Sequence, residues 1–536
     1  MLLDSVVRAS AAVAASPGRL AKIEEIARLL REVPPAEIPV AVAFLAGDLT
    51  QRQIGVGYAA LTDLLGDGSG TDEPEAATPV LSLAETDETL GQIGAQAGAG
   101  SQAERRRLLA ALMRRATPTE RQFLVRLLAG DLRQGALDGV MTEAIASAAA
   151  VPVAGVRRAY QLTGSLADAA AAALSPAGPT VALGEVALHV GRPVKPMLAS
   201  SAPTVAAAMD RISPAAVEWK IDGIRVQVHR RGDEVRVFTR TLDDITHRVP
   251  EVAAAIRALD VSTAVLDGEA VALRPDGRPY PFQVTSARAA SQASPDNARS
   301  PDGARRPAAP GQIPLTVFLF DALYLDGADL IDSPASERFA RLASVAPELV
   351  IPRLVTADTD EAAAFFADAV QRGHEGVVVK AVDAPYGAGR RGGDWIKVKP
   401  RHTLDLVVLA AEWGHGRRQG WLSNLHLGAR DPATGDMVML GKTFKGLTDA
   451  LLGWQTERLL ELALPEHGEH GHPQRGVVRV RPELVVEIAF DGVQASSRYP
   501  GGVTLRFARV LRYRPDKSPA EADTIDSVRA LWSGEL

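Results

Sequence analysis

The first third of the chain repeats apolar residues at the spacing of a helix. Over residues 18–33, one helical face carries Leu20, Ile23, Ala27 and Leu30. Such a face is buried when helices pack against one another. The pattern over residues 1–190 therefore predicts an all-α domain.

A second helix signal lies at residues 117–130. Thr117 and Glu120 form a capping box around Pro118, which takes the first helical position, and Gly130 ends the pattern. The apolar residues that this helix is predicted to bury are Phe123, Leu124, Leu127 and Leu128.

The pattern changes to that of β-strands after residue 190. Six short runs rich in β-branched residues are broken by Gly, Asp and Pro: 218–230, 234–240, 263–273, 315–325, 373–382 and 394–400. Helical stretches at 250–259 and 360–372 lie between them, so residues 191–402 are predicted to form a mixed α+β domain. Residues 287–312, rich in Ala, Ser, Pro and Arg, are a predicted flexible surface loop.

The last part of the chain alternates strand-like runs with Gly-rich turns. These runs are 404–414, 420–430, 437–444, 475–490 and 505–514. With a helix near 447–462, they predict a small β-barrel over residues 403–536. The expected organisation is therefore three domains: 1–190, 191–402 and 403–536.

Composition narrows the classes of function. The chain has 536 residues, of which 46% are hydrophobic and 23% charged, as expected for globular domains with buried cores. Cysteine is absent, which excludes disulfides and thiolate zinc sites. No uncharged apolar run approaches the roughly 18 residues of a membrane span, so we expect a cytoplasmic protein.

The net charge of −6 does not indicate a nucleic-acid-binding protein, although a basic face can be hidden in such a total. Arginines gather after the second of two predicted loops, 67–80 and 92–102. They are Arg105–Arg107, Arg114, Arg115, Arg126 and Arg133. They form either a solvated helix face or a surface that contacts phosphates.

Lys220 is unusual because it interrupts an apolar run in a chain with only nine lysines. Asp222, Gly223 and Arg225 follow it closely. An amine can lose its proton and act as a nucleophile, whereas a guanidinium in practice cannot. The alternative is a lysine whose charged end reaches solvent from a sheet edge.

Four further residues of matching chemistry lie beside predicted strands. Glu269 is expected at a strand end, Glu375 stands beside a glycine, and Lys397 and Lys399 share one strand face. Two carboxylates could hold Mg²⁺, and two lysines could face a phosphate.

Together and in this order, the motifs resemble those of the ATP-dependent DNA ligases. The matching segments are 192–199, 218–225, 239–246, 266–273, 318–327, 374–380 and 390–399. The resemblance covers essentially the whole chain and implies a helical DNA-binding domain, an adenylation domain and an OB-fold domain.

By this resemblance, Lys220 attacks the α-phosphorus of ATP, and Asp222 orients the reacting groups. AMP then passes to the 5′-phosphate of a nick in duplex DNA, and the 3′-hydroxyl displaces it. The other expected roles are adenine recognition by Glu218 and Phe320, ribose and phosphate binding by Arg225 and Arg240, Mg²⁺ binding by Glu269 and Glu375, and charge stabilisation at the α-phosphate by Arg391, Lys397 and Lys399.

Residues 505–517 resemble the last motif of the family, which implies that Arg506 and Lys517 align the leaving pyrophosphate. Ala508 stands where the family often has proline. The OB-fold domain is expected to swing about residues 400–405, and the protein to close around nicked DNA as a monomer.

Two segments have alternative interpretations, and three other classes of protein share some of these features. His467, His470 and His472 form either an exposed turn or a metal site, and 414–420 is predicted to be a hairpin turn. The lack of cysteine argues against an NAD-dependent ligase, which normally carries a four-cysteine zinc site. RNA ligases and capping enzymes share the lysine motif but usually lack the long helical domain. A DNA-binding scaffold with a silent pocket would form no covalent adenylate.

Overall fold

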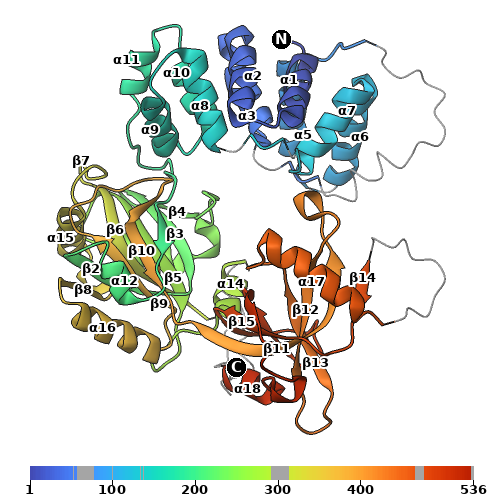
Figure 1. The fold of residues 1–536 in the computed structure, drawn as a ribbon. Helices are drawn as coiled ribbons and strands as arrows, with labels where there is room; N and C mark the ends of the chain where they lie inside the picture. Colours follow the sequence, from blue (N-terminus) through green and yellow to red (C-terminus); the bar gives the residue numbers. More distant parts are fainter. Residues whose placement is uncertain are drawn as a thin grey trace.

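The computed structural model describes residues 1–51, 54–56, 78–98, 100–132, 134–136, 138–290, 313–464 and 476–532. It has a helical N-terminal part, a mixed middle domain and a β-rich C-terminal domain (Figure 1). Most of the predicted 287–312 loop, most of the 67–80 loop, Arg133 and the His467–His472 segment lie outside the described residues.

The described elements between residues 3 and 184 are helices that share one apolar core. Their bounds are α1 (Leu3–Ala15), α2 (Arg19–Glu32), the 3₁₀ helix η1 (Pro35–Glu37), α3 (Ile38–Ala46), α5 (Leu83–Ala95), α6 (Ser101–Arg115), α7 (Pro118–Leu128), α8 (Asp138–Ala149), α9 (Val153–Thr163), α10 (Leu166–Ala173) and α11 (Pro179–Gly184).

The predicted caps and faces are largely present. In α7, Thr117 N donates to Glu120 Oε2 at 2.9 Å, and Thr117 Oγ1 accepts from Glu120 N, which completes the capping box. Ile23 is buried in α2, but the prediction for Leu20 was wrong, since it is 80% exposed. It lies in the first turn of α2. Residues 92–95 also belong to α5 rather than to a loop.

The middle domain contains two five-stranded sheets. One has the order β1-β10-β9-β2-β8 and the other β4-β3-β5-β6-β7. The strands are β1 (Leu198–Ser201), β2 (Ala215–Lys220), β3 (Ile224–Arg231), β4 (Glu234–Thr239), β5 (Thr263–Ala272), β6 (Leu315–Leu325), β7 (Ala328–Asp329), β8 (Arg353–Thr356), β9 (Gly376–Ala381) and β10 (Arg391–Val398).

Helices cover these sheets, and an apolar core that includes Phe320, Leu323 and Trp395 joins them. The helices are α12 (Val205–Met209), η2 (Thr246–Arg248), α13 (Pro250–Arg257), α14 (Phe282–Ala290), α15 (Ala335–Val345), η5 (Pro347–Leu349) and α16 (Thr359–Gln371). Residues 287–290 of the predicted loop are therefore the end of α14.

The C-terminal domain contains β11 (His402–Trp413), β12 (Leu422–Arg430), β13 (Met437–Thr443), β14 (Val477–Arg479), β15 (Val485–Phe490), β16 (Gly492–Ala495), β17 (Val503–Arg506) and β18 (Arg509–Tyr513). Its helices are η6 (Gly416–Arg418), α17 (Asp449–Glu461), η7 (Pro519–Glu521) and α18 (Ile525–Ala530). The 414–420 segment joins the antiparallel pair β11 and β12, as predicted.

The predicted small β-barrel is present in part: the domain is OB-fold-like, but its strands form an open sheet. Its main order is β13-β12-β11-β15-β18, with β14 beside β11, and β16 and β17 form a separate pair. The edges β13 and β18 approach where Val510 N donates to the Lys445 carbonyl at 3.0 Å. The chain then turns at Gly446, which has φ 85°, before a ladder can form.

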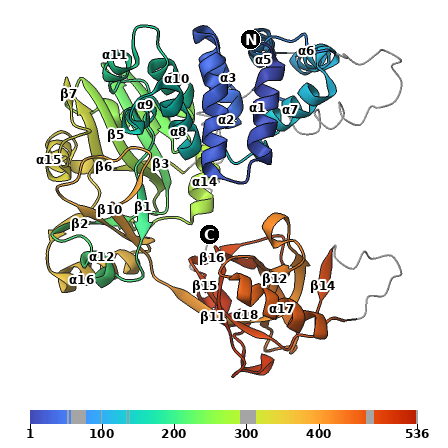
Figure 2. The same ribbon diagram turned by 45° about the horizontal axis from the view of Figure 1, so that its top comes forward.

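Packing and chain crossings connect the three parts. Leu162 of α9 joins the core of the middle domain, and Arg158 pairs with Asp332 at 2.5 Å. Both views show α8 to α10 beside the middle domain and β11 running across to the C-terminal domain (Figure 1, Figure 2). Among the described helices, none is long and apolar enough to cross a membrane.

Candidate active site

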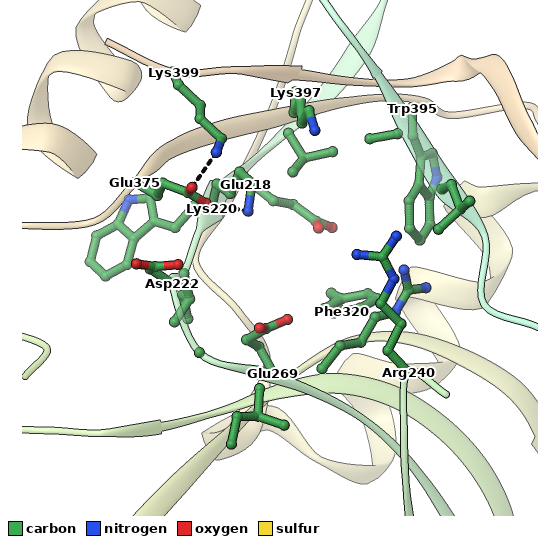
Figure 3. Close-up of a pocket in the computed structure, with 18 of the residues that line it drawn as sticks. Glu218, Lys220, Asp222, Arg240, Glu269, Phe320, Glu375, Trp395, Lys397 and Lys399 are labelled. Carbon is green, nitrogen blue, oxygen red and sulfur yellow. Dashed lines mark hydrogen bonds and ion pairs between the residues drawn. The ribbon is translucent and has the colours of Figure 1, made fainter. Parts of the chain in front are cut away.

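A pocket of about 700 Å³ lies where the two sheets of the middle domain meet, and the C-terminal domain contributes to its wall. The predicted residues that line it are Glu218, Lys220, Asp222, Arg225, Arg240, Glu269, Phe320, Glu375, Arg391, Lys397, Lys399 and Arg506. Figure 3 shows most of these side chains directed toward one central space. Residues distant in sequence thus form one site.

Lys220 ends β2 and projects into this pocket. Its amine is ion-paired with Glu375, whose carboxylate also pairs with Lys399. The backbone holds the pair in place, because Glu375 N donates to the Lys220 carbonyl at 2.8 Å. Burial alone would raise the pKa of Glu375, but Lys220 and Lys399 lower it below its ordinary value. Glu375 therefore stays ionised between two amines.

Two glycines allow the strands around Lys220 to approach. Gly376 has φ 134°, and a Cβ there would lie 2.2 Å from the Val398 carbonyl oxygen. A Cβ on Gly223 would lie 2.4 Å from the Ala270 carbonyl oxygen. Both distances are too short for any larger residue, so only glycine allows these close approaches beside Lys220.

Glu269 lies inside β5 opposite Arg225, not at a strand end as predicted. The strand continues to Ala272 because its neighbours β3 and β6 continue the ladder. Burial raises the pKa of Glu269 to about 8, against the opposing effects of Lys220 and Arg225. At neutral pH without a further cation, this carboxyl group is therefore largely protonated.

Arg225 is fixed by several partners beneath the pocket. Its guanidinium donates to Asp267 at 2.6 and 3.1 Å and to the Met197 carbonyl at 2.5 Å. The same group lies 5.4 Å from the centroid of the Phe320 ring. Arg225 can therefore support an aromatic surface as well as contact a ligand.

One side of the pocket is aromatic. The rings of Phe320 and Trp395 meet edge to face, with centroids 5.9 Å apart. Glu218 lies beside them, ion-paired with Arg353 at 2.6 Å and Lys380 at 2.5 Å. A flat base fits such a surface, with a carboxylate at its edge to accept hydrogen bonds.

Cations cover another side. Arg240, Arg391, Lys397 and Lys399 line the pocket together with Lys220. Burial lowers the pKa of Lys397, and the charges of Lys399, Lys220 and Arg391 lower it further. Such a crowded set of cations is stabilised by a polyanion, and a nucleotide triphosphate is a suitable one.

The C-terminal domain supplies two further contacts. Arg506 donates to Asp222 at 2.5 Å, and Asp491 pairs with Lys399 at 2.9 Å. Lys517, which was predicted to act beside Arg506, does not line the pocket. It pairs with Asp405 at 2.6 Å, so only one of the two predicted cations reaches the site in this arrangement.

Sequence reasoning did not assign roles to four residues of this region: Arg353, Lys380, Trp395 and Asp491. Lys380 carried a signal, because it is one of nine lysines in the chain. The others are ordinary strand or turn residues whose importance depends on which strands become neighbours.

The donors fit Mg²⁺ through the oxygens of Glu269 and Glu375. Mg²⁺ is usually held by one or two carboxylates together with substrate phosphates and waters, not by a complete protein cage. No group of three or more His, Asp or Glu side chains that could hold a metal occurs among the described residues.

Three segments of the chain match known families. Residues 196–399 match the family described as "ATP dependent DNA ligase domain". Residues 418–517 match "ATP dependent DNA ligase C terminal region", and residues 72–146 match "DNA ligase N terminus".

Similar proteins cover the whole chain. A "Probable DNA ligase" of Mycolicibacterium paratuberculosis is 55% identical over 536 residues, covering 99% of this chain and 98% of the relative. A "Probable DNA ligase" of Anaeromyxobacter dehalogenans is 54% identical and covers 100% of both chains. The solved structure described as "Pmar-Lig_PreS3" shares the fold, with a TM-score of 0.57 and 18% identity over 95% of this chain and 99% of that chain.

These matches extend from the N-terminal helices through the pocket to the OB-fold-like C-terminal domain. They confirm the resemblance inferred from the motifs and support a DNA ligase over the rival classes. Because the identity holds along the full length and the matched segments include the lysine pocket, the chain belongs to the ATP-dependent DNA ligase family.

Proposed function

We propose that this ligase seals nicks in duplex DNA through an AMP group carried on Lys220. The observation that supports this most strongly is the position of Lys220, whose amine projects into a pocket between an aromatic wall and a cluster of cations. Its pairing with Glu375 holds the amine in place before the nucleotide binds.

In the first step, Lys220 Nζ gives up a proton, for which the ion-paired Glu375 carboxylate is the neighbouring acceptor. The amine then attacks the α-phosphorus of ATP, and pyrophosphate leaves. Lys397, Lys399 and Arg391 stabilise the charge that develops on the phosphate oxygens. Arg240 and Arg225 bind the ribose and phosphate region, and Asp222 orients the reacting groups. Arg506 aligns the pyrophosphate from the C-terminal domain, supported by its contact with Asp222.

Adenine binds on the aromatic wall, with Phe320 against the ring and Glu218 accepting from the exocyclic amine. Mg²⁺, when bound by Glu269 and Glu375, would offset negative charge on the phosphates. Lys517 would join Arg506 only if residues near Asp405 rearranged, since it is paired there.

We propose that exposed arginines of α6 and α7 contact the DNA. They include Arg106, Arg114 and Arg126. Contacts of this kind are made to the phosphate backbone and weaken with salt. We further propose that the domains divide near residues 190 and 402, that the C-terminal domain moves about residues 400–405, and that one monomer encloses the nick in the cytoplasm.

The test uses ATP labelled at the α-phosphate, Mg²⁺ and full-length protein first freed of bound AMP. Label should attach to the protein and leave it as a nicked DNA duplex is sealed. Lys220→Arg should form no labelled adduct, because it keeps the charge but lacks the nucleophile. Lys195→Arg is the matched control, since Lys195 is a lysine of the same domain outside the pocket.

A labelled adduct in Lys220→Arg would remove Lys220 from this role. A parallel reaction with a nicked RNA duplex tests the choice of polymer. Joining of RNA but not DNA would contradict the proposed substrate while leaving the lysine chemistry intact.

A further inference from the structure

The carboxylate of Glu218 is held from both sides by buried cations. Glu218 is 1% exposed and lies in β2 between the strands β8 and β9. Arg353 of β8 stands opposite it in register and approaches Oε1 through Nε at 2.7 Å and through the terminal nitrogen at 2.6 Å. Lys380 of β9 pairs with Oε2 at 2.5 Å.

Arg353 also holds the aromatic wall. Its terminal nitrogen donates to the Phe320 carbonyl at 3.0 Å, and its guanidinium stacks 3.5 Å from the centroid of the Phe339 ring. A guanidinium is a rigid planar group. A single side chain thus fixes the Glu218 carboxylate relative to the backbone of Phe320, although Arg353 itself does not line the pocket.

These contacts leave little acceptor capacity on Glu218. An ionised carboxylate offers about four acceptor positions and no donor. Arg353 Nε donates to Oε1, and the ion pairs with Arg353 and Lys380 engage both oxygens, so only part of the acceptor capacity remains free. The carboxylate points into the pocket toward the side that carries Phe320 and Trp395 (Figure 3). Its free acceptor capacity therefore faces the edge of a base bound on that side.

We infer that Arg353 is a positioning residue that sets the preference of this ligase for adenine over guanine. Adenine carries an amino donor at its 6-position, and guanine carries a carbonyl acceptor there. An ionised carboxylate held in one position beside Phe320 accepts a hydrogen bond from the adenine amino group and repels the guanine carbonyl. The inference rests on the proposed binding of adenine between Phe320 and Glu218.

Loss of Arg353 frees Oε1 and the backbone of Phe320 together. The Glu218 carboxylate can then turn or bind water, so its acceptor oxygens are no longer held against a guanine carbonyl. The phosphate side of the pocket is untouched, because Lys220, Lys397 and Lys399 do not contact Arg353. The defect should therefore lie in the Michaelis constant for ATP and in base selectivity rather than in the maximal rate.

A purely structural role for Arg353 would be to join β2 to β8. Arg288 provides the matched control, because it has the same kind of contacts elsewhere in the domain. It is 5% exposed, donates to both oxygens of Glu251 at 2.8 and 2.9 Å, and donates to the Arg248 carbonyl at 2.7 Å. It does not line the pocket.

The experiment compares full-length wild type, Arg353→Met, Arg353→Lys and Arg288→Met. The initial rate of covalent labelling is measured against the concentration of ATP or GTP labelled at the α-phosphate, and thermal unfolding is recorded for each variant. Arg353→Met should lower the ATP-to-GTP ratio of kcat/KM by at least about tenfold, mostly through KM for ATP. Arg353→Lys keeps the charge without the planar guanidinium. Its ATP-to-GTP ratio of kcat/KM should lie between those of Arg353→Met and wild type.

Arg288→Met should lose stability but keep the wild-type nucleotide ratio. An unchanged ratio in Arg353→Met overturns the inference, and if that variant does not fold, an unchanged ratio in Arg353→Lys does so. A wild type that takes no label from ATP contradicts the proposed function itself, so the two failures are distinguishable.

Discussion

Replacing Arg506 by alanine should slow the attack of Lys220 on ATP while sparing the last step of ligation. Arg506 reaches the pocket from β17, where it donates to Asp222 at 2.5 Å and lies 5.5 Å from the centroid of the Phe282 ring. Pyrophosphate leaves only in the first step, so a cation that aligns it is not needed once AMP is attached to DNA.

The size of the effect follows from the environment of the guanidinium. A hydrogen bond to a charged group contributes about 1.5–3 kcal/mol. Arg506 keeps 23% of its side-chain exposure, so water competes for its charge and the lower half of that range applies. The labelling rate should therefore fall about 10- to 40-fold.

The test compares two rates in Arg506→Ala and wild type. One is the labelling of the protein by ATP, and the other is the sealing of a nick that already carries AMP on its 5′-phosphate. Arg512→Ala is the control, because Arg512 lies on β18, the next strand along the chain, pairs with Glu487 and is 64% exposed. If Arg506→Ala slowed both steps equally, the cation would serve binding or folding in general, and its assignment to pyrophosphate would be wrong.

Two further predictions concern packing and charge. Gly223→Ala places a Cβ against the Ala270 carbonyl, so we expect a loss of about 1–3 kcal/mol in unfolding free energy together with slower labelling; unchanged denaturant unfolding and labelling would contradict the close approach. Burial raises the pKa of Glu412, but hydrogen bonds, foremost from Lys442, lower it to about 2, below its value in the unfolded chain. Its ionised form therefore stabilises the fold above about pH 5, and this stabilisation is lost as the pH falls toward 2. Glu412→Gln should accordingly be less stable than wild type at pH 7 and equally stable near pH 2, as measured by denaturant unfolding; a constant difference would refute the assignment.

The local chemistry of the pocket could be predicted from the sequence, because its residues lie in short motifs of consecutive positions. Lys220 ends β2, Glu375 directly precedes β9 and Lys397 lies in β10, and the order of their motifs indicated the family. The capping box at Thr117 was equally local, and it is present as predicted. In each case a few consecutive residues specify both the backbone and the side chain.

Contacts between distant segments could not be predicted in the same way. Asp222 and Arg506 are 284 residues apart in sequence, and nothing near either of them indicates the other. Arg353 becomes important only because β8 lies beside β2. The error at Leu20 has the same origin, since helical spacing defines a face but not whether a neighbour covers its first turn.

Lys399 shows how such distant contacts connect the pocket to the position of the C-terminal domain. Its amine pairs with Glu375 in the middle domain and with Asp491 in the C-terminal domain. Burial alone would lower the pKa of Lys399, but these two carboxylates raise it above its ordinary value, so the amine keeps its charge. The phosphates of a bound nucleotide compete with Asp491 for this amine. A stronger contact between Lys399 and the phosphates therefore weakens its ion pair with Asp491. The occupancy of the pocket and the contact with the C-terminal domain are therefore linked through one lysine, as the proposed movement of that domain between steps requires.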